Sequence, residues 1–146
     1  MTRRGRKYKK NGVNMYIKDY FKIFHTNLQS AKNKVESLSS IVNTLNIDIV
    51  TTNETHLRGK DKFKLEGYLS FTRNRQNAIM GGIATSVKNE HSANTLKVAE
   101  GKDEEYIITR HSEFSPALNI INYYGKQESR QSVEETMLAG TQSLKK

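Results

Sequence analysis

The sequence predicts an α+β domain whose core is built from stacked β-sheets. A strand, a helix and a second strand follow one another between residues 20 and 52. Five further strand-like segments lie between residues 67 and 124, with turn residues about every ten positions. At 146 residues, the chain is long enough for one domain with a core and too short for two ordinary ones.

The first part of the chain has the pattern of a βαβ unit. Aromatic and β-branched residues predict a strand from Tyr20 to His25, and Ser30 is well placed to cap a following helix. The helix should continue to about Leu45 and bury one apolar face, made of Val35, Leu38, Ile41, Val42 and Leu45. A turn at Asn46 leads to a second strand over residues 47–52. Strand, helix and strand in this order predict a parallel pair.

The rest of the chain consists mainly of predicted strands, over residues 67–71, 82–87, 95–98, 105–109 and 118–124. Their spacing favours stacked sheets over a doubly wound sheet. Gly81-Gly82 lacks the lysine of a phosphate-binding loop and predicts a close approach of two backbones. Ser132 and Glu135 form a capping box that predicts a last helix, and residues 136–146 are expected to be an irregular tail. His91 and His111 are expected in polar loops.

Positive charge is concentrated in the first quarter of the chain. Residues 1–34 hold ten Lys and Arg against the single acid Asp19, and the remaining residues hold fourteen of each sign. Six of these cations precede the first predicted strand: Arg3, Arg4, Arg6, Lys7, Lys9 and Lys10. We expect residues 1–19 to be a disordered basic arm that binds the phosphate backbone of nucleic acid. A solvated tail without a partner is the alternative.

The composition also limits the compartment and the chemistry. The chain has no cysteine, which excludes disulfides and thiolate metal sites and fits a nuclear or cytoplasmic location. No apolar run approaches the roughly 20 residues that span a bilayer, so no membrane association is expected.

Three segments that end predicted strands carry a resemblance to a known family. They are Lys22–Asn27 (KIFHTN), Asp48–Thr55 (DIVTTNET) and Ile120–Gly125 (IINYYG). Together with Gly67-Tyr68 and Gly81-Gly82 between them, their order resembles the endonuclease/exonuclease/phosphatase superfamily. Within it, the sequence is most similar to the apurinic-endonuclease-like domains of non-LTR retroelements. The resemblance covers residues 21 to 130.

This resemblance implies a fold, a cofactor and a set of site residues. The fold would be a partial four-layer αββα sandwich over residues 20–135, with the C-terminal part missing. Glu54 matches the glutamate that binds Mg²⁺, an ion that prefers oxygen ligands. Asn27 matches an asparagine that orients the catalytic network, and Tyr124 matches the tyrosine that contacts the scissile phosphate. The implied substrate is nucleic acid, with DNA as the expected form.

The sequence also departs from the family pattern. Gln29 stands where relatives often have an acid, and neither a Gly-Asp-x-Asn nor a Ser-Asp-His motif is present. Since these motifs supply the groups that activate water, we expect the chain to be inactive as a nuclease on its own. Two other interpretations remain open. One is a non-enzymatic, basic nucleic-acid-binding module, and the other is a phosphatase-like enzyme acting on a small phosphoester or a lipid.

Overall fold

The first of two β-sheets contains the predicted βαβ unit. The structure, a computed structural model, describes residues 5–10, 13–18, 21–75, 81–102, 104–114 and 116–125. The strands β3 (Ile23–Asn27), β4 (Ile49–Asn53), β5 (Tyr68–Arg73) and β6 (Ile83–Lys88) form a sheet in the order β3-β4-β6-β5. β3 and β4 are parallel, as predicted, and the other neighbours are antiparallel.

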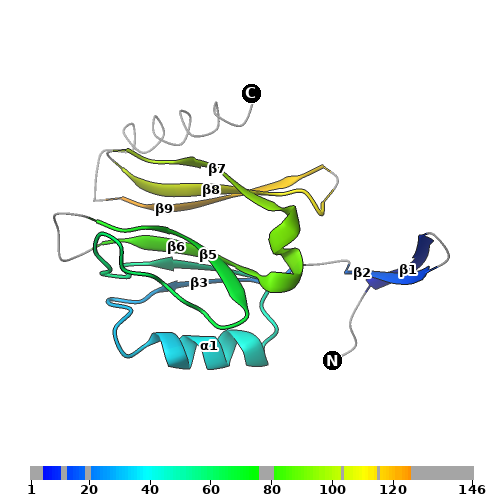
Figure 1. Ribbon diagram of the computed structural model, residues 1–146, viewed down its shortest axis with the longest axis horizontal. Helices are drawn as coiled ribbons and strands as arrows, with labels where there is room; N and C mark the ends of the chain where they lie inside the picture. The colour runs from blue at the N-terminus through cyan, green and yellow to red at the C-terminus, as the bar shows by residue number, and fades with distance from the viewer. Residues whose placement is uncertain are drawn as a thin grey trace.

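Helix α1 (Val35–Thr44) covers one face of this sheet (Figure 1). A single buried cluster joins the helix and the sheet; it consists of Leu28, Ala31, Leu38, Val42, Ile47, Val50, Phe63, Leu65, Tyr68 and Ala84. The Tyr68 hydroxyl donates hydrogen bonds to the carbonyl oxygens of Ile47 and Val42, at 2.5 and 3.3 Å. These bonds fix the end of α1 against β5.

Two details of the predicted helix are wrong. The N-cap residue is Lys34, without a side-chain cap, because Ser30 has a φ of 105° and its hydroxyl accepts a hydrogen bond from the Lys32 amide. Ile41 is 46% exposed and Leu45 is 50% exposed. At 3.6 residues per turn, Ile41 lies about 80° around the helix from the buried line of the cluster, and Leu45 lies beyond the last helical turn.

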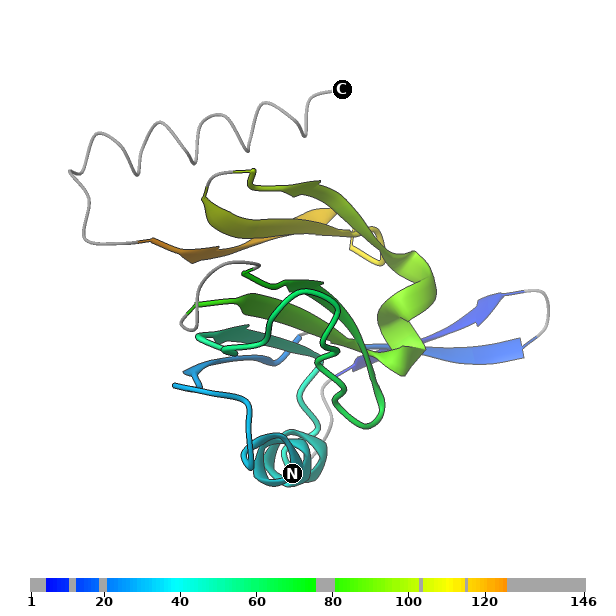
Figure 2. The same ribbon diagram turned by 60° about the vertical axis from the view of Figure 1, so that its left-hand side comes forward.

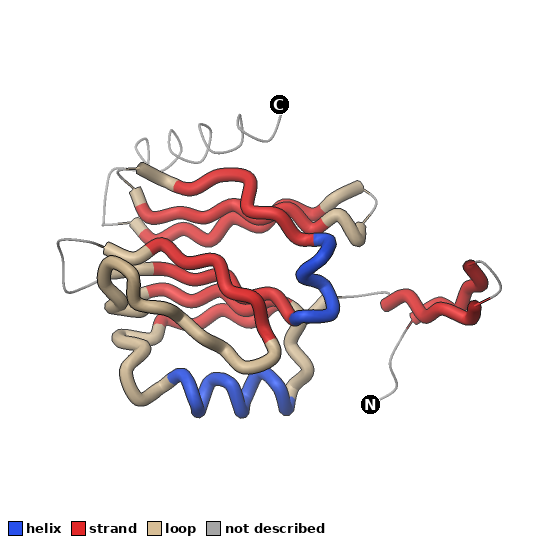
Figure 3. The backbone as a smooth tube through the Cα atoms, viewed as in Figure 1, coloured by secondary structure: helices blue, strands red, loops and turns tan. Residues whose placement is uncertain are grey.

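The second sheet covers the face of the first sheet that α1 leaves open (Figures 1 and 2). Its strands are β7 (Thr95–Glu100), β8 (Glu105–His111) and β9 (Leu118–Tyr124), all antiparallel in the order β7-β8-β9. A 3-10 helix, η1 (Asn89–Asn94), connects the two sheets (Figure 3). Asn122 of β9 donates a hydrogen bond to the carbonyl oxygen of Ala84 in β6, at 2.9 Å. The stacked-sheet α+β fold is therefore confirmed, and the described residues form three layers of the predicted sandwich, one helical and two of sheet.

The segment predicted as a basic arm contains two described strands. β1 (Gly5–Lys10) and β2 (Val13–Lys18) form an antiparallel pair that projects to one side of the two sheets (Figures 1 and 2). The sequence between the strands is Asn11-Gly12, the pair that most favours a two-residue hairpin turn. Four of the six predicted nucleic-acid-binding cations lie in β1, namely Arg6, Lys7, Lys9 and Lys10, while Arg3 and Arg4 lie outside the described residues.

The last helix predicted from Ser132, the domain boundary at residue 135 and the tail of residues 136–146 also lie outside the described residues. In the part of the chain that the structure describes, neither helix has the length and apolar character needed to cross a bilayer.

Candidate active site

The carboxyl ends of β3 and β4 bring Asn27 and Glu54 side by side. Asn27 is paired with Asn53, the residue before Glu54, in the parallel register. The pairing continues beyond the strands, because the Ser30 amide donates to the Glu54 carbonyl oxygen at 2.9 Å and the Ala31 amide to that of Thr55 at 2.8 Å. The two loops thus leave the sheet together and hold their side chains at one edge.

The backbone at this edge is strained. Outside glycine, positive φ angles occur at six residues of the described chain, and four of them lie within three residues of the end of β3 or β4: Gln29, Ser30, Glu54 and His56. A left-handed backbone costs on the order of 1–2 kcal/mol for a residue with a side chain. Such strain concentrates at functional sites, where it aims a side chain that regular structure would direct elsewhere.

Tyr124, at the end of β9, reaches the Glu54 carboxylate from the second sheet. Its hydroxyl donates a hydrogen bond of 2.7 Å to Glu54 Oε1. This bond is the main reason why the pKa of Glu54 is lowered; partial burial opposes it, and a hydrogen bond from Asn27 and the charge of His56 support it. Hydrogen bonding to Glu54 in turn raises the pKa of Tyr124. At neutral pH, Glu54 is ionised and Tyr124 is a protonated donor.

Two glycines hold the loop that carries Glu54. The Gly82 carbonyl oxygen accepts a hydrogen bond from the Thr55 amide at 3.1 Å, and that of Gly81 accepts one from the His56 amide at 2.8 Å. A Cβ atom on Gly82 would lie 2.4 Å from the Thr55 hydroxyl oxygen. The close backbone approach predicted for Gly81-Gly82 is confirmed, and its partner is the loop after Glu54.

A buried carboxylate of the second sheet fixes these glycines. Glu105 is 5% exposed, and its Oε1 accepts hydrogen bonds from the Gly82 amide at 2.9 Å and from Arg75 Nε at 2.7 Å. Glu105 is the cross-strand partner of Tyr124, so both side chains project from the same face toward the first sheet. Glu54, Tyr124, Glu105 and Arg75 therefore belong to one network.

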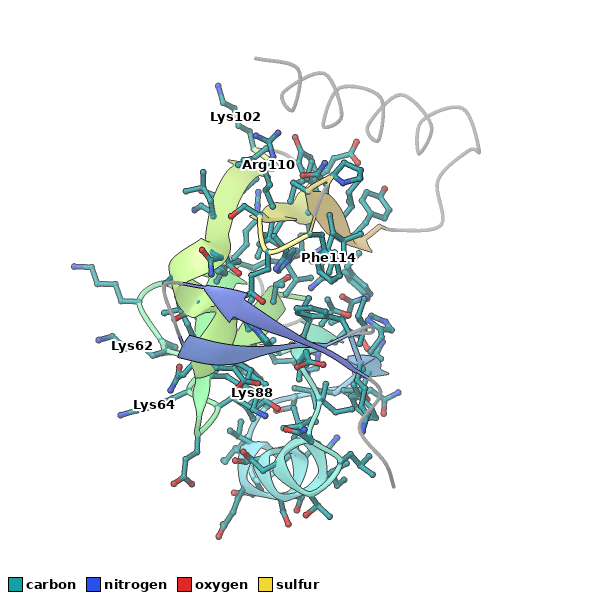
Figure 4. All side chains as sticks on the ribbon, turned by 90° about the vertical axis from the view of Figure 1, so that its right-hand side faces the viewer. Lys62, Lys64, Lys88, Lys102, Arg110 and Phe114 are labelled. Carbon is teal, nitrogen blue, oxygen red and sulfur yellow. The ribbon has the colours of Figure 1, made fainter. Side chains whose placement is uncertain are left out.

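Two unpartnered polar atoms flank Glu54 in the sequence, and a pocket lies along the loop that follows it. Asn53 Oδ1 and His56 Nε2, on either side of Glu54, are buried and have no hydrogen-bond partner within the described part of the chain. A pocket of about 660 Å³ begins at Thr55 and lies between residues 30–35 and 55–63. Its lining includes three cations, Lys32, Arg58 and Lys62, and Lys62 points outward from the molecule (Figure 4).

The Glu54 carboxylate is compatible with a hard divalent cation. Mg²⁺ is commonly held by one or two carboxylates and several waters, and Glu54 supplies one ionised carboxylate. The preceding residue contributes Asn53 Oδ1, a buried oxygen with no hydrogen-bond partner among the described residues. Gln29, whose backbone amide donates to Asn27 Oδ1 at 3.1 Å, is neutral and adds no charge at this edge.

A separate group of potential metal ligands lies at the opposite end of β4. Asp48, Glu90 and His91 place one ligand atom each within 4.8 Å of one another. Their atoms are already engaged, because His91 Nε2 lies 2.8 Å from Asp48 Oδ1 and His91 Nδ1 lies 2.8 Å from a Glu113 oxygen. The Lys22 amide also donates to Asp48 at 2.9 Å. We interpret this group as an ionic link between the two sheets.

The sequence prediction for the other histidines is wrong. His91 lies in η1 within this ionic cluster, and His111 is a buried residue of β8 that is 2% exposed. The structure places the predicted Asn27, Glu54 and Tyr124 close together, and their catalytic and metal-binding roles remain predictions. Sequence reasoning missed Arg75 and Glu105, whose relation to the site depends on the pairing of Glu105 with Tyr124.

Comparisons with known proteins give a relationship of structure. No family model and no curated protein matches this sequence. Among solved structures, the AP endonuclease LMAP from Leishmania major is similar, with a TM-score of 0.58 and 16% sequence identity. The match covers 71% of this chain and 40% of the Leishmania protein, so this chain spans less than half of that protein's length. The chain has an AP-endonuclease-like fold.

Proposed function

We propose that this chain contributes the first part of a metal-dependent endonuclease site of the retroelement type, acting on nucleic acid and most naturally on DNA. The observation that carries the proposal is the convergence of Asn27, Glu54 and Tyr124 at one sheet edge, with Tyr124 bonded to Glu54 at 2.7 Å. The fold similarity to an AP endonuclease supports it. In this proposal the nucleus or cytoplasm is the working compartment.

Each residue has a role that its surroundings favour. Glu54 holds Mg²⁺, which offsets negative charge on the phosphate when it is bound. Tyr124, kept protonated, donates a hydrogen bond to a phosphate oxygen, and Asn27 orients the Glu54 carboxylate. Strained backbone at Glu54 and His56 holds the carboxylate at the edge of the sheet.

The groups that would activate water are not among these residues. The aspartates of the sequence are Asp19, Asp48, Asp61 and Asp103, and Asp48 is committed to the ionic link at the far end of β4. We therefore propose that the catalytic site is incomplete within these 146 residues and that they do not cleave DNA on their own. Metal-dependent nicking by the purified chain that Glu54→Gln abolishes would contradict this.

The metal site can be tested with Mn²⁺ as a paramagnetic substitute for Mg²⁺. At low Mn²⁺ concentration, we expect NMR amide signals of Asn27 and Thr55 to broaden first. Glu54→Gln should remove this effect, and Glu66→Gln, the same change at an exposed residue, should leave it intact. Broadening centred on Asp48 and His91 would show that the ion prefers the other cluster and would refute the assignment of Glu54.

The basic hairpin favours a second candidate, a non-enzymatic nucleic-acid-binding module. β1, a six-residue strand that projects from the two sheets, carries four cations in its sequence, and such a charge density attracts phosphate backbones. This candidate expects salt-sensitive binding in EDTA that is unchanged by Glu54→Gln and lost when residues 1–12 are deleted. The endonuclease proposal expects Mg²⁺ to strengthen binding through Glu54.

A further inference from the structure

The Arg75 side chain is held in place next to the candidate active site. Its Nε donates to Glu105 Oε1 at 2.7 Å, and its Nη2 lies 3.5 Å from Glu105 Oε2. The Arg75 side chain passes over Gly81, where an added Cβ atom would lie 2.5 Å from Arg75 Nε. An isolated bridge also pairs the backbone of Arg75 with that of Arg58, in the loop after Glu54. The bonds to Glu105 and the closeness of Gly81 restrict the Arg75 side chain, and the bridge fixes its backbone.

The guanidinium nevertheless keeps an accessible edge. An arginine has five N–H donors, and Glu105 engages those of Nε and one of Nη2. Nη1 has no hydrogen-bond partner among the described residues, and the Arg75 side chain is 28% exposed, against 5% for Glu105. Glu105 also accepts from the Gly82 amide, so its charge is shared with a second donor. The result is a pre-organised cation with donors that Glu105 does not engage.

The position of this free edge relates it to the site. Glu105 is the cross-strand partner of Tyr124, and neighbours on one face of an antiparallel pair have Cβ atoms about 5 Å apart. Tyr124 is bonded to Glu54, so Arg75 and Glu54 are joined through only two intervening side chains. The hydrogen bond to Glu54, burial and the charges of Glu54 and Glu105 raise the pKa of Tyr124, and the positive charge of Arg75 opposes them.

We propose that Arg75, held by Glu105 over Gly81, is a phosphate-binding residue that contacts the phosphodiester backbone beside the Glu54–Tyr124 pair. The inference rests on the proposed function, since it assigns a further substrate contact to the same site. An arginine fork fits phosphate oxygens in a planar, two-donor geometry, and one already oriented by a carboxylate loses little freedom on binding. Glu105 is a positioning residue in this arrangement.

The test uses the full chain and a fluorescent DNA oligonucleotide, with affinity measured over a range of salt in EDTA. Removing Arg75 alone would leave a buried carboxylate unpaired, so the main variant is the double substitution Arg75→Met with Glu105→Gln. It keeps the net charge of +9 and retains an acceptor for the Gly82 amide. We expect affinity to fall roughly threefold to tenfold and the salt slope to decrease by about 1.

Arg110→Ala is the matched control. Arg110 lies on β8 five residues beyond Glu105, about 17 Å along the strand, and is labelled in Figure 4. The substitution Arg110→Ala lowers the net charge, which the double variant keeps unchanged. It should nevertheless weaken DNA binding less than the double variant does. A folded double variant that binds like the wild type would overturn the inference. If the double variant does not fold, Arg75→Lys replaces it, which keeps the charge and removes the fork; wild-type affinity there would overturn the inference equally.

The result is independent of the metal site. In EDTA, Glu54→Gln should not weaken binding, because no metal ion is present and a negative charge is removed. If the Arg75 variants lose DNA affinity but Glu54 does not bind Mn²⁺, Arg75 binds phosphate and the proposed function is wrong. If the Arg75 variants bind DNA like the wild type and Glu54 binds Mn²⁺, the proposed function stands and Arg75 makes no phosphate contact.

Discussion

At the residue scale, the Glu54 carboxylate depends on a donor from another sheet. The Tyr124 hydroxyl lowers the pKa of Glu54 more than any other group does. We expect Tyr124→Phe to raise the pKa of Glu54 toward the ordinary glutamate value of 4.5, measured by NMR titration of the side-chain carboxyl carbon. A glutamate whose pKa is lower in the folded than in the unfolded state stabilises the fold at pH values above the unfolded pKa. In the wild type, this contribution of Glu54 to stability is lost as the pH falls through the folded pKa.

Tyr123→Phe is the control for this measurement. The Tyr123 hydroxyl donates to Glu104 at 3.2 Å and not to Glu54. The same substitution one residue earlier should therefore leave the pKa of Glu54 unchanged. Equal shifts in both variants would show that Tyr124 is not the specific partner of Glu54.

The neutral Gln29 offers a gain-of-binding test. It follows β3 two residues after Asn27 and is exposed at the same sheet edge as Glu54. A second carboxylate there would give a hard cation another oxygen ligand, so Gln29→Asp should strengthen Mn²⁺ binding severalfold in a titration. Asn33→Asp adds the same charge to an exposed residue of the same loop and should have a smaller effect. An equal gain in both would indicate general electrostatic attraction.

At the scale of elements, the loop after β4 depends on the backbone that precedes β6. We expect Gly82→Ala to displace Thr55, since the new Cβ would lie 2.4 Å from its hydroxyl oxygen and the φ of +86° disfavours a side chain. The variant should unfold at a lower denaturant concentration, with a loss of about 2 kcal/mol or more, and the pKa of Glu54 should change.

Gly59→Ala separates the two causes. Gly59 also has a positive φ, +51°, but nothing lies within 4 Å of its Cβ position. It should lose only about 1 kcal/mol from backbone conformation and should leave Glu54 unaffected. A similar result for both glycines would mean that the contact with Thr55 is not what matters.

Sequence periodicity predicted these elements better than it predicted their ends and partners. The β9 prediction, residues 118–124, matches the structure, because a run rich in isoleucine and tyrosine is a local signal for a strand. The cap at Ser30 failed because the pairing of Ser30 and Ala31 with the Glu54 loop determines the backbone there. Nothing in the sequence indicated that Arg75 and Glu105 form an ion pair, because this contact depends on how the two sheets stack.

At the scale of the whole molecule, a histidine links the two sheets. His91 lies between Asp48, which precedes β4, and Glu113, which follows β8, at 2.8 Å from an oxygen of each. Phe21 packs against the imidazole, with ring centroids 4.7 Å apart. Burial acts to lower the pKa of His91, but the hydrogen bond that its ring donates to Asp48 and the charges of Glu113, Asp48 and Glu90 outweigh burial, so the pKa is raised.

His111, on the inward face of β8, has the opposite behaviour. Its ring nitrogens lie 3.2 Å from the Thr95 hydroxyl and 2.9 Å from that of Thr109. Burial, together with the charge of His91, lowers the pKa of His111 to about 4. The ring is neutral in the folded protein at neutral pH. Relative to an unfolded pKa near 6.5, this shift means that protonating His111 in the folded protein costs about 3 kcal/mol more than in the unfolded chain.

These two histidines should give the fold a stability maximum near pH 6.5. The raised pKa of His91 contributes stability that is complete below about 6.5 and is lost as pH rises through the higher folded value. The lowered pKa of His111 has the reverse effect, because the unfolded state binds its proton first; stability is lost as pH falls from about 6.5 to about 4. One proton limits each slope to about 1.4 kcal/mol per pH unit.

Urea unfolding at a series of pH values tests this, with the slopes rather than the absolute stabilities compared between variants. His91→Gln should flatten the alkaline limb and leave the acid limb in place, whereas His111→Asn should flatten the acid limb. Both variants remove buried hydrogen bonds and are expected to be less stable overall, which does not affect the comparison of slopes. An alkaline limb that persists in His91→Gln would mean that the charge joining the two sheets does not reside on this histidine.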